Sequence, residues 1–262
     1  MRAVSLRTTL LACCTAPVVA LVAVAALAPL PFAITEPGMT ADVLGDYRGE
    51  EVITVSGTET RKTSGELRMT TIAATAPETD VGVTDVVDAW FDEERAVLPH
   101  DAVYPAGKTP EQVEKHNAAE MRESQHTATA AALRLLHRSP GSVRVKLSLA
   151  QVGGPSAGLM FALGIVDKLD GDGRGGDLTG GRTIAGTGTI TEHGAVGAVG
   201  GVPLKTRAAV RDGATVFLVP KQECAEAQAS LPHGLRLIPV STLKGAVSAL
   251  KALDSGGRVP SC

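Results

Sequence analysis

The stretch Gly153-Gly154-Pro155-Ser156-Ala157-Gly158 decides the fold of this chain, and it leads directly into the apolar run Leu159–Leu169. The segment Val143–Leu149 precedes it and alternates strictly between apolar and polar residues, which is typical of a half-buried strand. Glycines at a strand-to-helix junction permit a tight turn and a close approach of other backbone. The stretch therefore predicts a strand, a glycine-rich turn and a buried helix whose first turn holds Ser156.

Helix and strand signals alternate along the rest of the chain without a regular βαβ repeat. Thr109 as N-cap, Pro110 as first helical residue and Gln112 as capping-box partner mark the start of a long helix. The expected helices are 109–137, 203–213, 222–230 and 243–253, and the expected strands are 183–190, 216–219, 235–240, and 52–55 with 67–72 around a turn at 63–65. This mixture predicts an α+β fold.

Composition excludes several classes of function. The 262 residues are 44% hydrophobic and 20% charged. The sequence contains 25 Lys and Arg and 28 Asp and Glu, which gives a net charge of −3. A chain without basic excess and with 3% aromatic residues is a poor candidate for binding nucleic acid. The sequence has no phosphate-binding loop of the Gly-x-x-x-x-Gly-Lys-Ser/Thr type and no Cys/His spacing typical of a metal site. We therefore expect no cofactor and no metal.

The N-terminal segment predicts a membrane anchor. Residues 8–34 contain no charged side chain, and these 27 residues (34 − 8 + 1) exceed the roughly 20 that a membrane-spanning helix needs. Arg2 and Arg7 precede the segment and acidic residues follow it from Glu36, which places the N-terminus in the cytoplasm and the remaining chain outside. A cleaved signal peptide is the alternative, with Ala26-Leu27-Ala28 as the cleavage site, although Pro29 disfavours cutting there.

Four cysteines are present, and two of them lie beyond the apolar segment. Cys13 and Cys14 fall within that segment and are expected to pack as small apolar side chains. In an oxidising compartment, Cys224 and Cys262 would form a disulfide that closes a loop of 38 residues (262 − 224). Two free thiols remain the alternative.

Ser156 is the candidate nucleophile. Backbone N–H groups at a helix N-terminus have no partner within the helix, and together with the helix dipole they can stabilise a developing oxyanion. The serine also needs a base, and two alternatives exist. Gly154–Gly158 fits the Gly-x-Ser-x-Gly pattern of α/β-hydrolases, whose base would be His193 or His233. The other candidate base is Lys205, expected in the first turn of a helix, where burial and the dipole would lower its pKa.

Taken together, these segments resemble the proteolytic domain of the Lon family. Gly154–Gly158 resembles the nucleophile motif of that family, Thr187-Gly188-Thr189-Ile190 its Thr-Gly strand, and Gly200–Lys205 its lysine motif. The helix that begins at Met121-Arg122-Glu123-Ser124 resembles the helix before the nucleophile. The resemblance covers about residues 50–253 and implies the ribosomal protein S5 domain 2-like fold.

The resemblance also implies roles for individual residues. Ser156 and Lys205 would form a catalytic dyad, and Thr187 would hydrogen-bond the lysine. The backbone N–H groups at Gly154, Ser156 and Ala157 would form the oxyanion site. Relatives of Lon often assemble as rings, so a homo-oligomer is expected by analogy.

Within the family, the chain is most similar to membrane-anchored Lon-domain proteins that carry a PDZ module and no ATPase, on the basis of its N-terminal segment, Ala89–Asp92 and Val103–Pro105. Only a few residues separate Leu136 from Val143, so a PDZ module is not expected between them. The expected organisation is an anchor (1–34), a tether (35–49), a Lon-type domain (50–255) and a tail (256–262).

The expected function is an ATP-independent, membrane-anchored serine endopeptidase that acts on polypeptides outside the cytoplasm or in the membrane. Two alternatives remain: a non-catalytic binding or scaffold domain, and an esterase that pairs Ser156 with a histidine.

Overall fold

The computed structural model describes residues 6–104, 109–139, 141–149 and 154–262. The chain divides into two compact units. Unit 1 comprises residues 1–36 and 74–108, and unit 2 comprises residues 37–73 and 109–262. The stretch that leads into Ser156 belongs to unit 2, as do all residues proposed for catalysis.

Unit 1 is small and built from short elements. It contains α1 (Leu6–Leu27), the first residues of β1 (Phe32–Asp42), α2 (Val83–Phe91), β6 (Ala96–Pro99) and α3 (His100–Val103). Phe32–Thr35 pair antiparallel with β6. The Thr75 N–H donates a hydrogen bond to the Ile34 carbonyl at 2.9 Å, which joins the two chain segments of the unit.

The N-terminal helix differs from the predicted membrane anchor. It ends at Leu27, whereas the prediction extends to residue 34, and residues 32–34 begin β1. Pro29 and Pro31 explain the early end, because proline lacks a backbone N–H and disfavours helix in the residue before it. Within the described residues, no helix has the length and apolar character needed to cross a membrane.

Unit 2 is organised around a sheet with the strand order β12-β11-β8-β5-β1. Its strands beyond β1 are β5 (Glu66–Ala74), β8 (Thr183–Gly186), β11 (Val216–Pro220) and β12 (Arg236–Val240). Each neighbouring pair from β5 to β12 is parallel. Helices α6 (Val202–Arg211) and α7 (Cys224–Ala229) lie in the connections between β8, β11 and β12. The fold is mixed, but this part contains the parallel crossovers that the α+β prediction did not anticipate.

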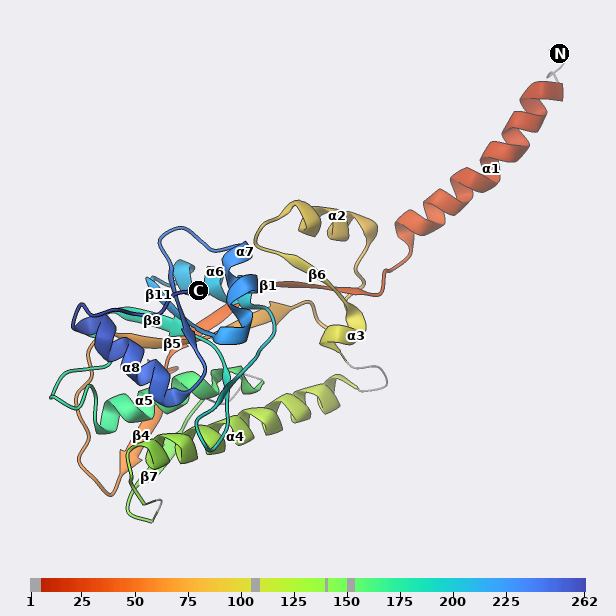
Figure 1. The fold of residues 1–262 in the computed structure, drawn as a ribbon. Coiled ribbons are helices and arrows are strands. Elements are labelled where there is room, and N and C mark those ends of the chain that lie inside the picture. The colour runs from red at the N-terminus through yellow and green to blue at the C-terminus, as the bar shows by residue number, and fades with distance from the viewer. Residues whose placement is uncertain (1–5, 105–108, 140, 150–153) are drawn as a thin grey trace. The chain divides into compact units, whose positions relative to one another are not determined.

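Helices pack beside this sheet in unit 2 (Figure 1). The remaining elements are β2 (Asp46–Tyr47), β3 (Glu50–Glu51), β4 (Ile53–Ser56), α4 (Pro110–Leu135), β7 (Arg144–Leu147), η1 (Pro155–Ala157), α5 (Gly158–Leu169), β9 (Thr189–Ile190), β10 (Val196–Gly197), η2 (Lys221–Glu223) and α8 (Leu243–Asp254). Every residue of α5 is buried, and α5 packs against both α4 and α8. The turn with Ser156 is thus fixed to the most buried helix of the unit.

Several local predictions are confirmed and others are wrong. Thr109 caps α4 and exchanges hydrogen bonds with Gln112, as the capping box predicts. The predicted tether at 35–49 is wrong, because residues 35–42 continue β1. Pro37 and Gly38 are unusual in a strand and hide its pattern in the sequence, although the residues on both sides of them are partly buried. The predicted strand pair 52–55 and 67–72 is also wrong as a hairpin, since β4 pairs with β7 and β5 joins the large sheet.

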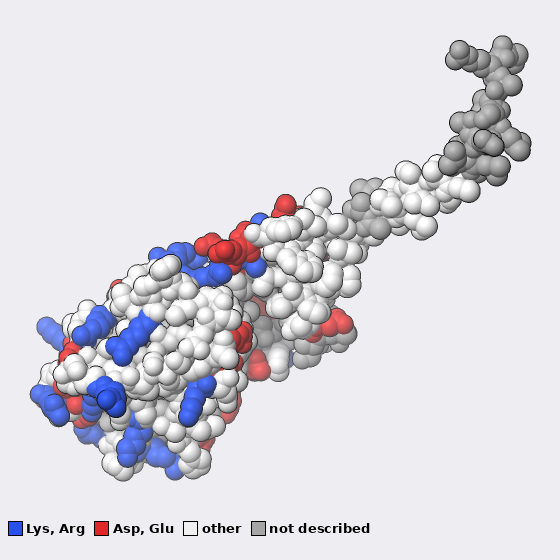
Figure 2. Space-filling model, turned by 45° about the horizontal axis from the view of Figure 1, so that its top comes forward, with Lys and Arg blue, Asp and Glu red and all other residues white. Residues whose placement is uncertain are grey.

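The charged surface agrees with the composition. On the face shown in Figure 2, Lys and Arg side chains are scattered among acidic and uncharged ones and form no continuous basic band. Binding to a polyanion requires clustered positive charge. The charge on that face is therefore mixed, as the net charge of −3 implies.

Candidate active site

The backbone around Ser156 has a shape that depends on glycine. Gly154 precedes the 3₁₀ turn η1 with φ of +88° and ψ of 160°, a conformation that L side chains rarely adopt. Pro155 occupies the first position of the turn, where its missing N–H costs nothing. Ser156 follows immediately and lies one residue before the last residue of η1, which continues into α5. Gly153, the first residue of the motif, lies outside the described residues.

Helix α4 holds this loop from one side. The Ser124 hydroxyl donates a hydrogen bond to the Pro155 carbonyl at 3.0 Å. The Gly154 N–H donates to the Asn117 carbonyl at 3.3 Å. Gly158 fits closely here, because a Cβ on it would lie 2.9 Å from the Ser124 oxygen. These contacts fix the backbone immediately before and after the serine.

The end of β8 holds the loop from the other side. The Ser156 carbonyl accepts a hydrogen bond from the Gly188 N–H at 2.9 Å and another from the Thr187 hydroxyl at 3.3 Å. Thr187 is fully buried. The backbone of Ser156 is therefore anchored to the central sheet.

Lys205 lies in the first turn of α6, as predicted. Gly201 caps that helix in the left-handed region with φ of +70°, and a Cβ there would meet the Ile72 side chain at 2.9 Å. Lys205 is 3% exposed. Burial lowers the pKa of its amine to about 8 by disfavouring the charged form, while the negative charges of Glu223 and Glu226 act in the opposite direction.

Ser156 and Lys205 line one pocket, whose volume is about 270 Å³. Thr71 and Ile72 of β5 form part of its wall, and residues 198–200, which precede α6, form another part. Among the described residues of this lining, Lys205 is the one that carries a charge. Within the described part of the chain, no hydrogen bond joins the Ser156 hydroxyl to the Lys205 amine. The arrangement brings a hydroxyl and a partly neutral amine to one mostly uncharged cavity.

Two groups that were predicted to support catalysis form hydrogen bonds with partners other than the predicted ones. The Thr187 hydroxyl donates to the Ser156 carbonyl, whereas the predicted partner is Lys205. The Gly154 N–H is already bonded to Asn117, so it is not available for the oxyanion role. That role stays a prediction for the N–H groups of Ser156 and Ala157.

Neither histidine of the esterase alternative reaches the serine. His193 and His233 are exposed, and both are absent from the residues that line the pocket of Ser156. A histidine base must lie within hydrogen-bond reach of the hydroxyl or be linked to it by one water. The geometry therefore favours Lys205 as the base.

Two residues of the site were not singled out from the sequence. Ser124 lies in the helix segment that resembles the Lon family, but its bond to Pro155 depends on how α4 crosses the loop. Glu223 accepts a hydrogen bond from the Val199 N–H in the pocket wall at 2.8 Å. No local pattern marks this contact, because 24 residues separate the two partners.

Comparison with known proteins matches the same part of the chain. Residues 143–251 match the family model described as the Lon protease (S16) C-terminal proteolytic domain. Residues 143–251, the Lon-type domain, are therefore similar to the proteolytic domain of Lon proteases. The domain contains Ser156, Thr187 and Lys205, and the family that it matches is one of serine-type peptidases. The match is narrower than the resemblance over residues 50–253.

A curated relative supports the assignment. The Lon protease of Azospirillum brasilense is 38% identical over 93 residues, which are 34% of this chain and 11% of that protein. This chain thus spans about a tenth of the length of that relative. The similarity concerns the Lon-type domain alone.

The Lon-type domain is followed by a disulfide-bonded C-terminus. Cys224, at the start of α7, and Cys262, the last residue, are the pair that the sequence predicts, and the structure joins them. Both pack against a core cluster that includes Phe217 and Leu237. The bond ties the tail to the helix that follows Glu223.

Proposed function

We propose that this chain is a serine endopeptidase in which Ser156 is the nucleophile and Lys205 is the general base. The observation that carries the proposal is that both side chains line one pocket, where burial lowers the pKa of Lys205 to about 8. A lysine with a pKa near neutrality has a substantial neutral fraction and can accept a proton. The Lon-type domain supplies the class of reaction.

The mechanism follows from these positions. Neutral Lys205 removes the proton of the Ser156 hydroxyl as the oxygen attacks the peptide carbonyl. The N–H groups of Ser156 and Ala157, at the positive end of η1 and α5, would stabilise the oxyanion. The ammonium then returns the proton to the leaving amine, and water hydrolyses the acyl-enzyme by the same route in reverse.

The two groups must come closer for the reaction. In the free protein they share a cavity without a direct hydrogen bond, and catalytic hydrogen bonds often shorten only when substrate binds. The Ser156 backbone is fixed by Gly188 and Thr187. The approach therefore requires rotation of the two side chains, while the backbone can stay in place.

The test is cleavage of an unfolded protein by the purified full chain without ATP. We expect Ser156→Ala and Lys205→Ala each to lower the rate by at least about a thousand-fold. Lys205→Arg keeps the positive charge but cannot supply a neutral base, so it should be equally inactive. Exposed Ser248→Ala and Lys221→Ala are the matched controls. Full activity in any of the three site variants would overturn the dyad, and binding without cleavage by the wild type would favour the scaffold alternative.

Independence from ATP and attachment to a membrane are further parts of the proposal. The first is supported by the lack of a phosphate-binding loop in the sequence. The second is supported by the uncharged residues 8–34, by Arg2 and Arg7 before them, and by valine and leucine side chains of α1 that are 58–69% exposed. The measurement is recovery of the full chain in membranes after alkaline carbonate washing, with protease protection to assign the side. Release of the chain by carbonate would contradict the proposed membrane anchor. Protection of the Lon-type domain on the cytoplasmic side would contradict the proposed extracytoplasmic location.

A further inference from the structure

A second pocket adjoins the one that holds Ser156. Its volume is about 230 Å³, and Pro155 and Thr189 line both pockets. The other lining residues are Glu120, Glu123, Ser124 and Thr127 of α4 together with Ile190. Because Pro155 is the residue before the nucleophile, a polypeptide bound across Ser156 would place a neighbouring side chain in this second pocket.

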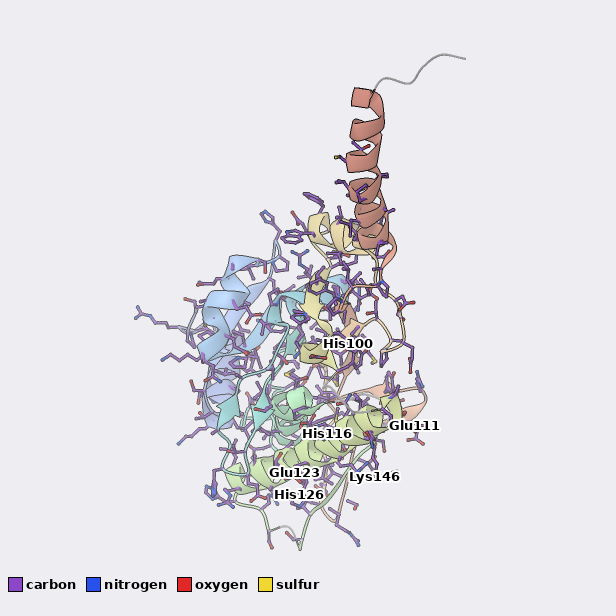
Figure 3. The ribbon with its side chains drawn as sticks, turned by 90° about the vertical axis from the view of Figure 1, so that its right-hand side faces the viewer. His100, Glu111, His116, Glu123, His126 and Lys146 are labelled. Carbon is purple, nitrogen blue, oxygen red and sulfur yellow. A yellow bond between two sulfur atoms is a disulfide. The ribbon has the colours of Figure 1, made fainter. Side chains whose placement is uncertain are left out.

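The second pocket differs from the first in charge. Glu120 and Glu123 are its charged lining residues, and a separation of three places them on one face of α4. Glu120 lies 3.5 Å from His116 on the same helix. For the Glu123 carboxylate, the described residues provide no ion pair or hydrogen bond. Figure 3 shows Glu123 and His116 along α4, with Glu111 near the start of the helix.

Among the described residues, no lysine or arginine lines this second pocket. Arg122 and His126 are exposed on the same helix, but neither is among its lining residues. Lys205 lines the first pocket and is absent from the second. The free negative charge therefore remains available to a ligand that enters beside the nucleophile.

We propose that Glu120 and Glu123 form a subsite for a lysine or arginine side chain of the substrate. The peptidase would then prefer polypeptides with a basic residue at one position next to the scissile bond. This inference rests on the proposed function, because it assumes that a polypeptide lies across Ser156. Thr127 and the apolar surface of Ile190 would accommodate the methylene stem, and the carboxylates would pair with the charged end.

The expected preference is modest. Partly exposed ion pairs contribute little each, so we expect kcat/KM for a basic side chain to exceed that for glutamine by about three- to ten-fold. The preference should shrink as salt concentration rises, because added ions screen exposed charges. Glutamate at the same position should be the poorest of the three.

The experiment uses the full chain and peptides of one sequence in which lysine, glutamine or glutamate is moved through the positions on both sides of the scissile bond. The readout is the ratio of kcat/KM for lysine over glutamine at each position. Glu123→Gln and Glu120→Gln should bring that ratio toward one, and Glu123→Lys should reverse it in favour of glutamate. Glu111→Gln, an exposed glutamate on the same helix outside the pocket, is the matched control and should leave the ratio unchanged.

The outcomes separate this inference from the proposed function. If Ser156-dependent cleavage occurs but no position favours lysine, or if Glu123→Lys leaves the preference intact, the subsite is wrong and the peptidase stands. If no peptide is cleaved by a chain that circular dichroism shows to be folded, the proposed function fails first. If Glu111→Gln lowers the lysine-over-glutamine ratio as much as Glu123→Gln does, the preference comes from the overall charge of α4. The proposed subsite would then be wrong.

Discussion

Glu223 and Val199 are joined by a 2.8 Å hydrogen bond in which the backbone N–H of Val199 donates to one carboxylate oxygen. The second oxygen of Glu223 is buried without a hydrogen-bond partner within the described residues. Val199 lines the pocket of Ser156 and Lys205, so Glu223 both supports the pocket wall and places a negative charge near the lysine. Burial raises the pKa of Glu223, and the positive charge of Lys205 partly opposes that rise.

The activity should depend on pH through Lys205. Its amine must be neutral to accept the serine proton, and its pKa is lowered to about 8. We therefore expect kcat/KM to rise about ten-fold per pH unit below pH 8 and to level off above it. The measurement is peptide cleavage between pH 6 and pH 9.5 at constant ionic strength. A profile that is flat across this range would contradict Lys205 as the base.

The variant Glu223→Gln should move that rise to lower pH. The amide oxygen can still accept the Val199 hydrogen bond, but the negative charge that raises the pKa of Lys205 is lost. Exposed Glu226→Gln should shift the profile in the same direction by a smaller amount, because solvent screens its charge. A shift to higher pH, or an unchanged profile together with full activity, would show that Glu223 has no electrostatic effect on the lysine.

The sequence predicts local elements well because their signals lie within a few residues. The cap at Thr109, the glycine turn before Ser156 and the helix start at Lys205 are all of this kind. The pairing partners of strands are harder to predict, because they lie far apart in the sequence. About 90 residues separate β4 from its partner β7. Strand β1 was not predicted because Pro37 and Gly38 interrupt the alternation of residues that marks a strand. The contacts of Ser124 and Glu223 also arise from the way separate elements cross.

Removal of the Ser124 hydroxyl should weaken catalysis more than folding. This hydroxyl donates to the Pro155 carbonyl at 3.0 Å and so fixes the backbone next to the nucleophile. We expect Ser124→Ala to cost about 1 kcal/mol of unfolding free energy and to lower kcat by about ten-fold or more, since small displacements of a nucleophile are costly. Urea unfolding and peptide kinetics measure the two effects. Thr129→Ala, whose hydroxyl bonds within α4, is the control and should keep kcat.

Loss of the disulfide should destabilise the domain in a redox-dependent way. The bond closes a loop of 38 residues, for which the loop-entropy model gives about 4 kcal/mol. Dithiothreitol should therefore lower the melting temperature of the wild type and leave a Cys224→Ser/Cys262→Ser double variant unchanged. Cys14→Ser, which removes an unbonded cysteine, should respond like the wild type. Equal melting of oxidised and reduced wild type would show that the bond adds no stability.

Asp167 should make the stability of the domain fall as pH rises. Its side chain is fully buried in α5, one oxygen accepts the Leu178 N–H at 2.8 Å, and the other has no hydrogen-bond partner among the described residues. Burial raises the pKa of this carboxyl to about 6 from 3.8. The folded state therefore binds the proton more tightly than the unfolded chain, and this contribution to stability is lost as pH rises through 6.

Between pH 5 and pH 8, this loss amounts to about 1–2 kcal/mol for the wild type. Asp167→Asn cannot ionise, so its unfolding free energy relative to the wild type should increase by that amount over the same range. Urea unfolding at the two pH values measures the change, and exposed Asp170→Asn is the matched control that should track the wild type. If the difference in unfolding free energy between Asp167→Asn and the wild type is the same at both pH values, the prediction is wrong. The carboxyl of Asp167 would then keep the same charge from pH 5 to pH 8, because only its loss of a proton can make this difference grow.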